Sequence, residues 1–227
     1  MVTALRPTSL DHVALWVDDR APLSAFLCDH LGMHVIEETD SFTLVGVDAK
    51  LGKLTLFEAD GPRARGALER VVLRVRDVES VAGKLPVDVE HEADGVAFTA
   101  PAGLRLGLVE AEGVDFDLDH VVLRLPDPDG AARKLATMGF ERRDGHVVVA
   151  DRYVRLVGGR REDGSRPLLN HLALLVDSAR EAQQQAEARG LEIEEIKDAP
   201  NTLAVFVRGP AGVRIEYVEH KPGFALH

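Results

Sequence analysis

The chain of 227 residues is 45% hydrophobic, which supplies enough apolar side chains for one large domain or two small ones. Its formal net charge of −11 argues against nucleic acid and anionic membranes as partners, because both bind cationic surfaces. The single cysteine, Cys28, excludes a disulfide framework, and no stretch approaches the roughly 18 consecutive apolar residues of a membrane span. With no secretion signal at the N-terminus, we expect a cytoplasmic protein.

Four short apolar segments open with nearly the same phrase. They read LDHVAL at 10–15, LERVVL at 68–73, LDHVVL at 118–123 and LNHLAL at 169–174. The third residue of each phrase recurs at intervals of about 50 residues, at His12, Arg70, His120 and His171. A repeat of this period indicates one supersecondary unit that is used four times.

Periodicity predicts the elements within each unit. After the opening strands of the first, third and fourth units, apolar residues at helical spacing end at a glycine, and short alternating segments follow between turn residues in all four units. The pattern predicts, in chain order, a helix over 22–31, strands at 43–47, 54–58, 96–99 and 104–109, a helix over 128–138, strands at 146–150 and 153–157, a helix over 178–189, and strands at 203–207 and 213–218. Each unit is therefore predicted to be a βαβββ module, and the fold class is α+β.

The repeated module and its opening phrase resemble the vicinal oxygen chelate superfamily, which includes glyoxalases, bleomycin-type resistance proteins and extradiol ring-cleaving dioxygenases. The resemblance covers nearly the whole chain. It implies that the four modules pair into two mixed-sheet, cup-like half-barrels, with a divalent metal held on a concave face by residues of first and last strands. We expect consecutive modules to pair, giving a domain over 1–113 without a metal and a domain over 114–227 that carries it.

The resemblance to two-domain ring-cleaving dioxygenases assigns the metal ligands to His120, His171 and Glu216. Alternation along 213–218 supports the glutamate, because it places Glu216 on the face opposite Ile215. Two neutral imidazoles and one carboxylate leave several coordination sites open, which is typical of non-heme Fe(II) oxygenases. We therefore expect Fe(II), with Mn(II) or Zn(II) as alternatives, since the general order of metal affinities does not favour iron.

The first two modules lack an equivalent ligand set. Their last-strand positions corresponding to Glu216 are Thr55 and Gly107, and neither side chain is an ordinary metal ligand. The N-terminal half is therefore predicted to be a structural partner, in which His12 is either a relic of a former ligand set or a hydrogen-bonded core residue.

Ring cleavage also needs a group that accepts a proton from the substrate. The positions at which relatives carry a histidine and a tyrosine for this purpose fall on Val157 and Phe206 in this chain. Residues on neighbouring strands are therefore the candidates for catalysis, namely His146, Tyr153, Arg155 and His220.

The resemblance thus implies a dioxygenase that acts on a small catechol-like aromatic substrate with dioxygen. A metal-dependent lyase or isomerase is an alternative, although it would need a fourth ligand where Val154, Arg155 and Leu156 stand. A non-catalytic binding or resistance protein is another, although its groove would draw on only one Trp, two Tyr and eight Phe. The sequence leaves the substrate and a homo-oligomeric state open.

Overall fold

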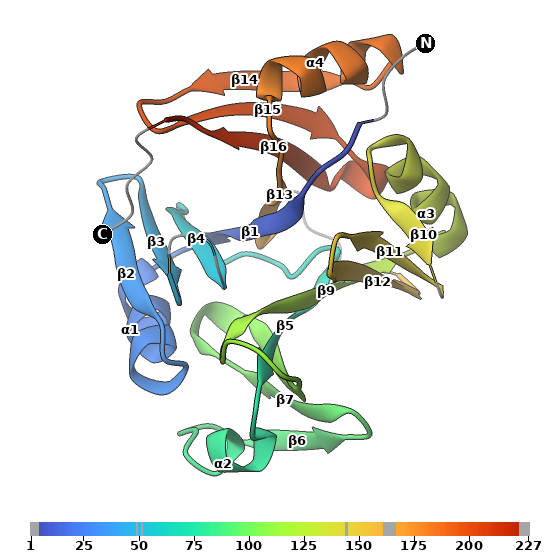
Figure 1. Cartoon of the computed structure of the whole chain (residues 1–227). Coiled ribbons are helices and arrows are strands. Elements are labelled where there is room, and N and C mark those ends of the chain that lie inside the picture. The colour runs from blue at the N-terminus through green and yellow to red at the C-terminus, as the bar shows by residue number, and fades with distance from the viewer. Residues whose placement is uncertain (1–4, 49, 51, 144, 161–166, 223–227) are drawn as a thin grey trace.

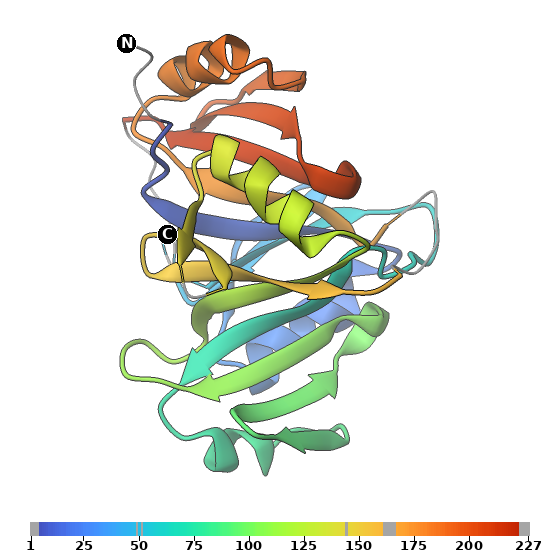
Figure 2. The same ribbon diagram turned by 90° about the vertical axis from the view of Figure 1, so that its right-hand side faces the viewer.

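The computed structural model describes residues 5–48, 50, 52–143, 145–160 and 167–222. These residues form two eight-stranded mixed sheets, which stand one above the other in the side view (Figures 1 and 2). Each quarter of the chain contributes a βαβββ module, so the predicted α+β fold class is confirmed. None of the described helices is long and apolar enough to span a membrane.

The first sheet combines the first and the fourth module. Its strand order is β14-β15-β16-β13-β1-β4-β3-β2. The bounds are β1 Ser9–Val17, β2 His34–Glu38, β3 Phe42–Gly46, β4 Lys53–Glu58, β13 Leu169–Leu175, β14 Ile193–Asp198, β15 Thr202–Arg208 and β16 Arg214–His220.

The second sheet combines the second and the third module in the same way. Its strand order is β10-β11-β12-β9-β5-β8-β7-β6. The bounds are β5 Leu68–Val75, β6 Val89–Glu92, β7 Gly95–Thr99, β8 Arg105–Glu110, β9 Asp117–Leu125, β10 Glu141–Arg143, β11 His146–Val149 and β12 Arg152–Gly158.

The predicted pairing of consecutive modules is therefore wrong. The antiparallel partner of β1 is β13, and that of β5 is β9, so the outer two modules share one sheet and the inner two share the other. The expected boundary at 113/114 lies in the link from β8 to β9, two strands of one sheet. The repeat shows that four modules exist, but each opening strand offers a similar apolar edge, so the repeat alone does not select the partner.

Each helix begins at a side chain that accepts a hydrogen bond from a backbone N–H of its first turn. The four helices are α1 Arg20–His30, α2 Val78–Ala82, α3 Pro128–Thr137 and α4 Ala179–Ala188. Their capping residues are Asp19, Asp77, Asp127 and Ser178.

Two of these helices lie at the junction of the sheets, as Figure 2 shows for α3. Helix α1 packs against the turn Pro101–Gly103 of the second sheet, and α3 packs against the turn Pro210–Gly212 of the first. The fully buried Tyr217 of β16 donates a hydrogen bond of 2.8 Å to the carbonyl of Met138, which follows α3. These contacts join the two sheets through one continuous apolar core.

The chain passes between the sheets twice, and the two crossings touch. The backbone N–H of Leu168 donates to the carbonyl of Ala64 at 2.7 Å, and Ala64 forms a parallel bridge with Pro167. Gly66, on the first of these crossings, adopts φ +62°, and a Cβ at this position would lie 2.8 Å from the Cβ of Pro167 on the second. Glycine is required here both for the left-handed backbone and for the close approach.

Replacing Gly66 by alanine is expected to destabilise the protein by about 1–2 kcal/mol, because it adds backbone strain and a clash with Pro167. The measurement is the free energy of unfolding from denaturant titration. Gly158→Ala is the matched control, because its nearest neighbour, Pro128 Cγ, would be 3.8 Å from the new Cβ. Equal stability of the two variants would contradict this account of the crossing.

Candidate metal centre

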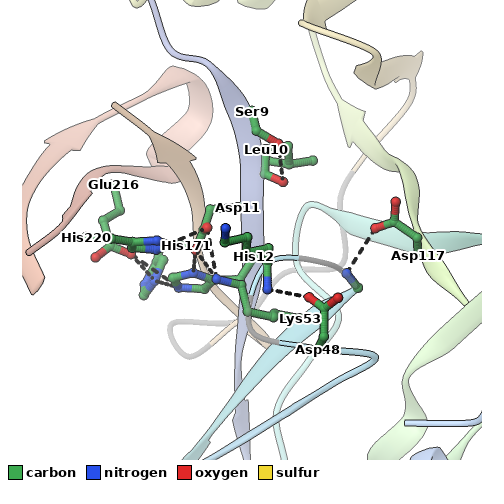
Figure 3. Close-up of polar contacts among 12 residues, drawn as sticks. Ser9, Leu10, Asp11, His12, Asp48, Lys53, Asp117, His171, Glu216 and His220 are labelled. Carbon is green, nitrogen blue, oxygen red and sulfur yellow. Dashed lines mark hydrogen bonds and ion pairs between the residues drawn. The ribbon is translucent and has the colours of Figure 1, made fainter. Parts of the chain in front are cut away.

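Three adjacent strands of the first sheet direct a histidine, a second histidine and a glutamate toward one point (Figure 3). His12 lies on β1, His171 on β13 and Glu216 on β16. The Nε2 atoms of the two imidazoles are 3.1 Å apart, and Glu216 Oε2 lies 2.8 Å from His171 Nε2 and 3.3 Å from His12 Nε2. Among the described residues, this is the group whose ligand atoms could hold one metal ion.

Both imidazoles are oriented by the residue that precedes them. His12 Nδ1 lies 2.8 Å from a carboxylate oxygen of Asp11, and His171 Nδ1 lies 3.0 Å from Oδ1 of Asn170. With each Nδ1–H donated to these oxygens, the lone pair of a neutral ring lies on Nε2. The two lone pairs then point at each other and at Glu216, which is the orientation that metal-ligating histidines require.

The donor set therefore fits a divalent cation. One oxygen of Glu216 is buried and receives no aligned hydrogen bond, although two imidazole nitrogens surround it. A buried carboxylate and two converging lone pairs repel one another unless a proton or a cation lies between them. Two imidazoles and one carboxylate are suitable ligands for Fe(II), Mn(II) or Zn(II).

A buried ion pair holds Asp11 in place behind His12. Lys53 of β4 is only 2% exposed, and its Nζ lies 2.9 Å from both carboxylate oxygens of Asp11. His220 Nε2 lies 3.3 Å from Asp11 Oδ1. Burial alone would raise the pKa of Asp11, but the hydrogen bonds with His12 and His220 and the charge of Lys53 hold it well below its usual value. Asp11 is therefore a fixed anion that orients His12.

The second sheet positions Lys53. Asp117 of β9 accepts a hydrogen bond of 3.0 Å from the backbone N–H of Gly52, directly before Lys53 (Figure 3). Arg152 of β12 forms a buried ion pair with the other oxygen of Asp117. The start of β4, and with it the support of His12, is thus tied to the neighbouring sheet.

The protonation states of the cluster are strongly perturbed. Burial would lower the pKa of His12, but its contacts with Asp11 and Glu216 raise it to about 9. Burial would raise the pKa of Glu216, but His12 and His171 hold it well below its usual value. Burial lowers the pKa of His171, and Glu216 only partly opposes this shift. Without a cation, a proton on His12 therefore compensates the charge of Glu216 at neutral pH.

The cluster opens into a cavity of about 290 Å³. The rings of Phe57 and Phe206 lie beside His171, with centroid distances of 6.2 and 5.2 Å. Phe42 extends this apolar wall, and its ring centroid is 5.8 Å from that of Phe57. His220 and Asn201 contribute polar groups to the lining. The shape and lining suit a small molecule with an apolar body and a polar end that reaches the cluster.

The structure brings together two of the three predicted metal ligands. His171 and Glu216 are in contact, whereas His120 lies on β9 in the second sheet. His12 occupies the position in the cluster that was predicted for His120. The expectation that His12 is a core residue of a metal-free half assumed that ligands come from consecutive modules. The sequence LDH is the same around His12 and His120, and it marks both as candidate ligands. Only the pairing of β1 with β13 shows that His12 is the one beside His171.

The four predicted catalytic residues divide between the two sheets. His220 lines the cavity beside the cluster. His146 lies on β11, while Tyr153 and Arg155 lie on β12, all in the second sheet. Their assignment to the same centre as Glu216 followed from the predicted pairing of the third and fourth modules, and it is corrected with that pairing.

Comparisons with known proteins agree with the fold. The family model described as the Glyoxalase/Bleomycin resistance protein/Dioxygenase superfamily matches residues 9–217. A Bacillus subtilis protein provisionally described as a dioxygenase shares 20% identity and a TM-score of 0.79, over 98% of this chain and 88% of that chain. Glyoxalase I from Zea mays shares 15% identity and a TM-score of 0.72, over 94% of this chain and 92% of that one. Among curated proteins, no sequence matches the chain.

We expect His12→Ala to abolish stoichiometric metal binding, because it removes one of three ligands, whereas His120→Ala retains it. The measurement is metal content by elemental mass spectrometry after anaerobic reconstitution with Fe(II). The two variants remove the same side chain from equivalent strands and therefore control for each other. Loss of metal in His120→Ala with retention in His12→Ala would contradict this assignment.

Metal binding at pH 7 is expected to release about one proton, because the pKa of His12, about 9, lies above the pH and the ligand must be neutral. The lowered pKa of His171 means that it contributes no proton. Release should therefore vanish as the pH rises through 9, and metal affinity should increase up to that point. Calorimetry in buffers of different ionisation enthalpy measures this number. Binding at pH 7 without proton release would show that His12 is already neutral.

Proposed function

Because this chain belongs to the glyoxalase/bleomycin resistance protein/dioxygenase superfamily, we propose that it is a metal-dependent ring-cleaving dioxygenase acting on a catechol-like aromatic. Its metal ligands are His12, His171 and Glu216. The observation that carries the proposal is a cluster of two histidines and one glutamate that opens into an apolar cavity lined by phenylalanine rings. Fe(II) is the proposed metal, with Mn(II) or Zn(II) as alternatives, since this donor set accepts all three.

The number of protein ligands favours a dioxygenase over a lyase or isomerase. On β4, the position equivalent to Glu216 is Thr55, which lies opposite Ala14 in the register of β1 and β4. Threonine is not an ordinary metal ligand, so three protein ligands are available rather than four. A divalent iron held by His12, His171 and Glu216 would supply the redox chemistry that cleavage of a diol by dioxygen needs.

The residues of the cavity have separate tasks in this proposal. Phe42, Phe57 and Phe206 contact the aromatic ring of the substrate and exclude water from the reacting end. His220 is the group that accepts a proton from a substrate hydroxyl, because it lines the same cavity. Asp11, 3.3 Å from His220 Nε2, stabilises the imidazolium that results.

The proposal is tested by oxygen uptake with a panel of substituted catechols after anaerobic loading with Fe(II). We expect the wild type to consume oxygen in proportion to the ring opened, and Glu216→Ala to lose more than about 100-fold of this activity. His120→Ala, which alters the other sheet, should keep it. His220→Gln should lower kcat while leaving metal content unchanged, because its side chain is not a ligand.

A metal-loaded wild type that consumes no oxygen with any catechol would overturn the dioxygenase proposal. If that protein instead isomerised a thiol adduct of a 2-oxoaldehyde, the lyase alternative would replace it. Oxygen uptake that persists in Glu216→Ala would place the reaction elsewhere in the chain.

A further inference from the structure

The second sheet contains a site equivalent to the metal centre but with the opposite charge. In the first sheet, the register places Thr55 opposite Ala14 and Glu216 opposite Ala173, each two residues beyond a histidine. In the second sheet, Gly107 lies opposite Val72, two residues beyond Arg70. Arg155 lies opposite Val122, two residues beyond His120. Two guanidinium groups and one imidazole therefore occupy positions that hold two imidazoles and a carboxylate in the first sheet.

His120 is oriented as a ligand would be. Its Nδ1 lies 2.6 Å from Asp119 Oδ1, as His12 Nδ1 lies 2.8 Å from Asp11, and its side chain is only 7% exposed. The ring stacks on Tyr153 with a centroid distance of 4.3 Å, which fixes its plane. Its Nε2 makes no hydrogen bond to any residue in the described part of the chain, and His120 lines a small cavity.

The two arginines of this cavity have unused donors. Arg70 donates from Nη1 to Glu92 at 2.7 Å, but its Nε is buried and has no hydrogen-bond partner. No described residue accepts a hydrogen bond from the guanidinium of Arg155. Gly107 makes the room for Arg70, because a Cβ at 107 would lie 3.0 Å from Arg70 Cδ.

These groups cannot hold a cation, because no carboxylate converges with the imidazole as Glu216 does in the first sheet. Guanidinium groups match the oxygens of a carboxylate or a phosphate, and the imidazole of His120 lines the same cavity. The cavity, of about 80 Å³, has room for one such group. Glu92 and Asp94 also line this cavity, but both are exposed, so water screens their charges. We propose that this cavity of the second sheet, which we call the second cup, binds a small oxyanion, a carboxylate or phosphate group, between Arg70, His120 and Arg155.

The test uses the full-length, metal-free protein with histidine rings labelled with carbon-13. Sodium phosphate and sodium acetate are titrated separately at fixed pH, and sodium chloride keeps the ionic strength constant. The resonance of His120 reports on the second cup, and the resonances of His12 and His171 report on the metal centre of the first sheet, the first cup. We expect a saturable shift of His120 with a Kd on the order of 1 mM for at least one of the two anions.

Arg155→Gln and Arg70→Gln should each weaken this binding about tenfold, because each removes a charge-assisted hydrogen bond. Arg155 is exposed, so its variant should fold normally even if Arg70→Gln does not. Arg143→Gln, which removes an exposed arginine elsewhere on the same sheet, is the matched control. Saturation by acetate would identify a carboxylate ligand, and saturation by phosphate alone would identify a phosphate group. Shifts that chloride reproduces, or binding unchanged in both arginine variants, would overturn the proposal.

Discussion

The antiparallel pairing of β1 with β13 is the contact on which the rest of the structure depends. It joins the first module to the last, and it places Ala14 opposite His171 so that His12 and His171 approach each other across the strand pair. The inner modules pair by the same rule through β5 and β9. If consecutive modules paired instead, His12 would lie beside Arg70, and His120 would take its place beside His171 and Glu216.

The two cups show how one scaffold supports opposite electrostatics. In both, a histidine is held through Nδ1 by the acidic residue before it, as Asp11 holds His12 and Asp119 holds His120. The difference arises at two positions: Glu216 in one sheet corresponds to Arg155 in the other, and one histidine of the first sheet corresponds to Arg70. These two positions decide whether the imidazole shares its site with a carboxylate or with guanidinium groups, and with this the charge of the ligand that we propose for each site.

Much of the fold could be predicted from the sequence, because the opening phrase recurs in every quarter of the chain and a helix that ends at a glycine could be recognised in three of them. The short helix α2 was not predicted. The outermost strands β2, β6, β10 and β14 were not predicted, since they are largely exposed on both faces and show no alternation. Glu216 was found through the family resemblance, and His220 was found because alternation along the same strand places it on the same side as Glu216. His12 was missed because its role depends on which modules pair, and this is decided by contacts between strands more than 150 residues apart, which local pattern does not encode.

The central claim is that the outer two modules form the metal centre together. Diffraction from crystals grown with Mn(II), recorded at two wavelengths on either side of the manganese absorption edge, locates the ion directly. We predict one anomalous peak per chain, bounded by His12 Nε2, His171 Nε2 and the carboxylate of Glu216. A peak beside His120, or none in a crystal whose dissolved protein contains manganese, would contradict it.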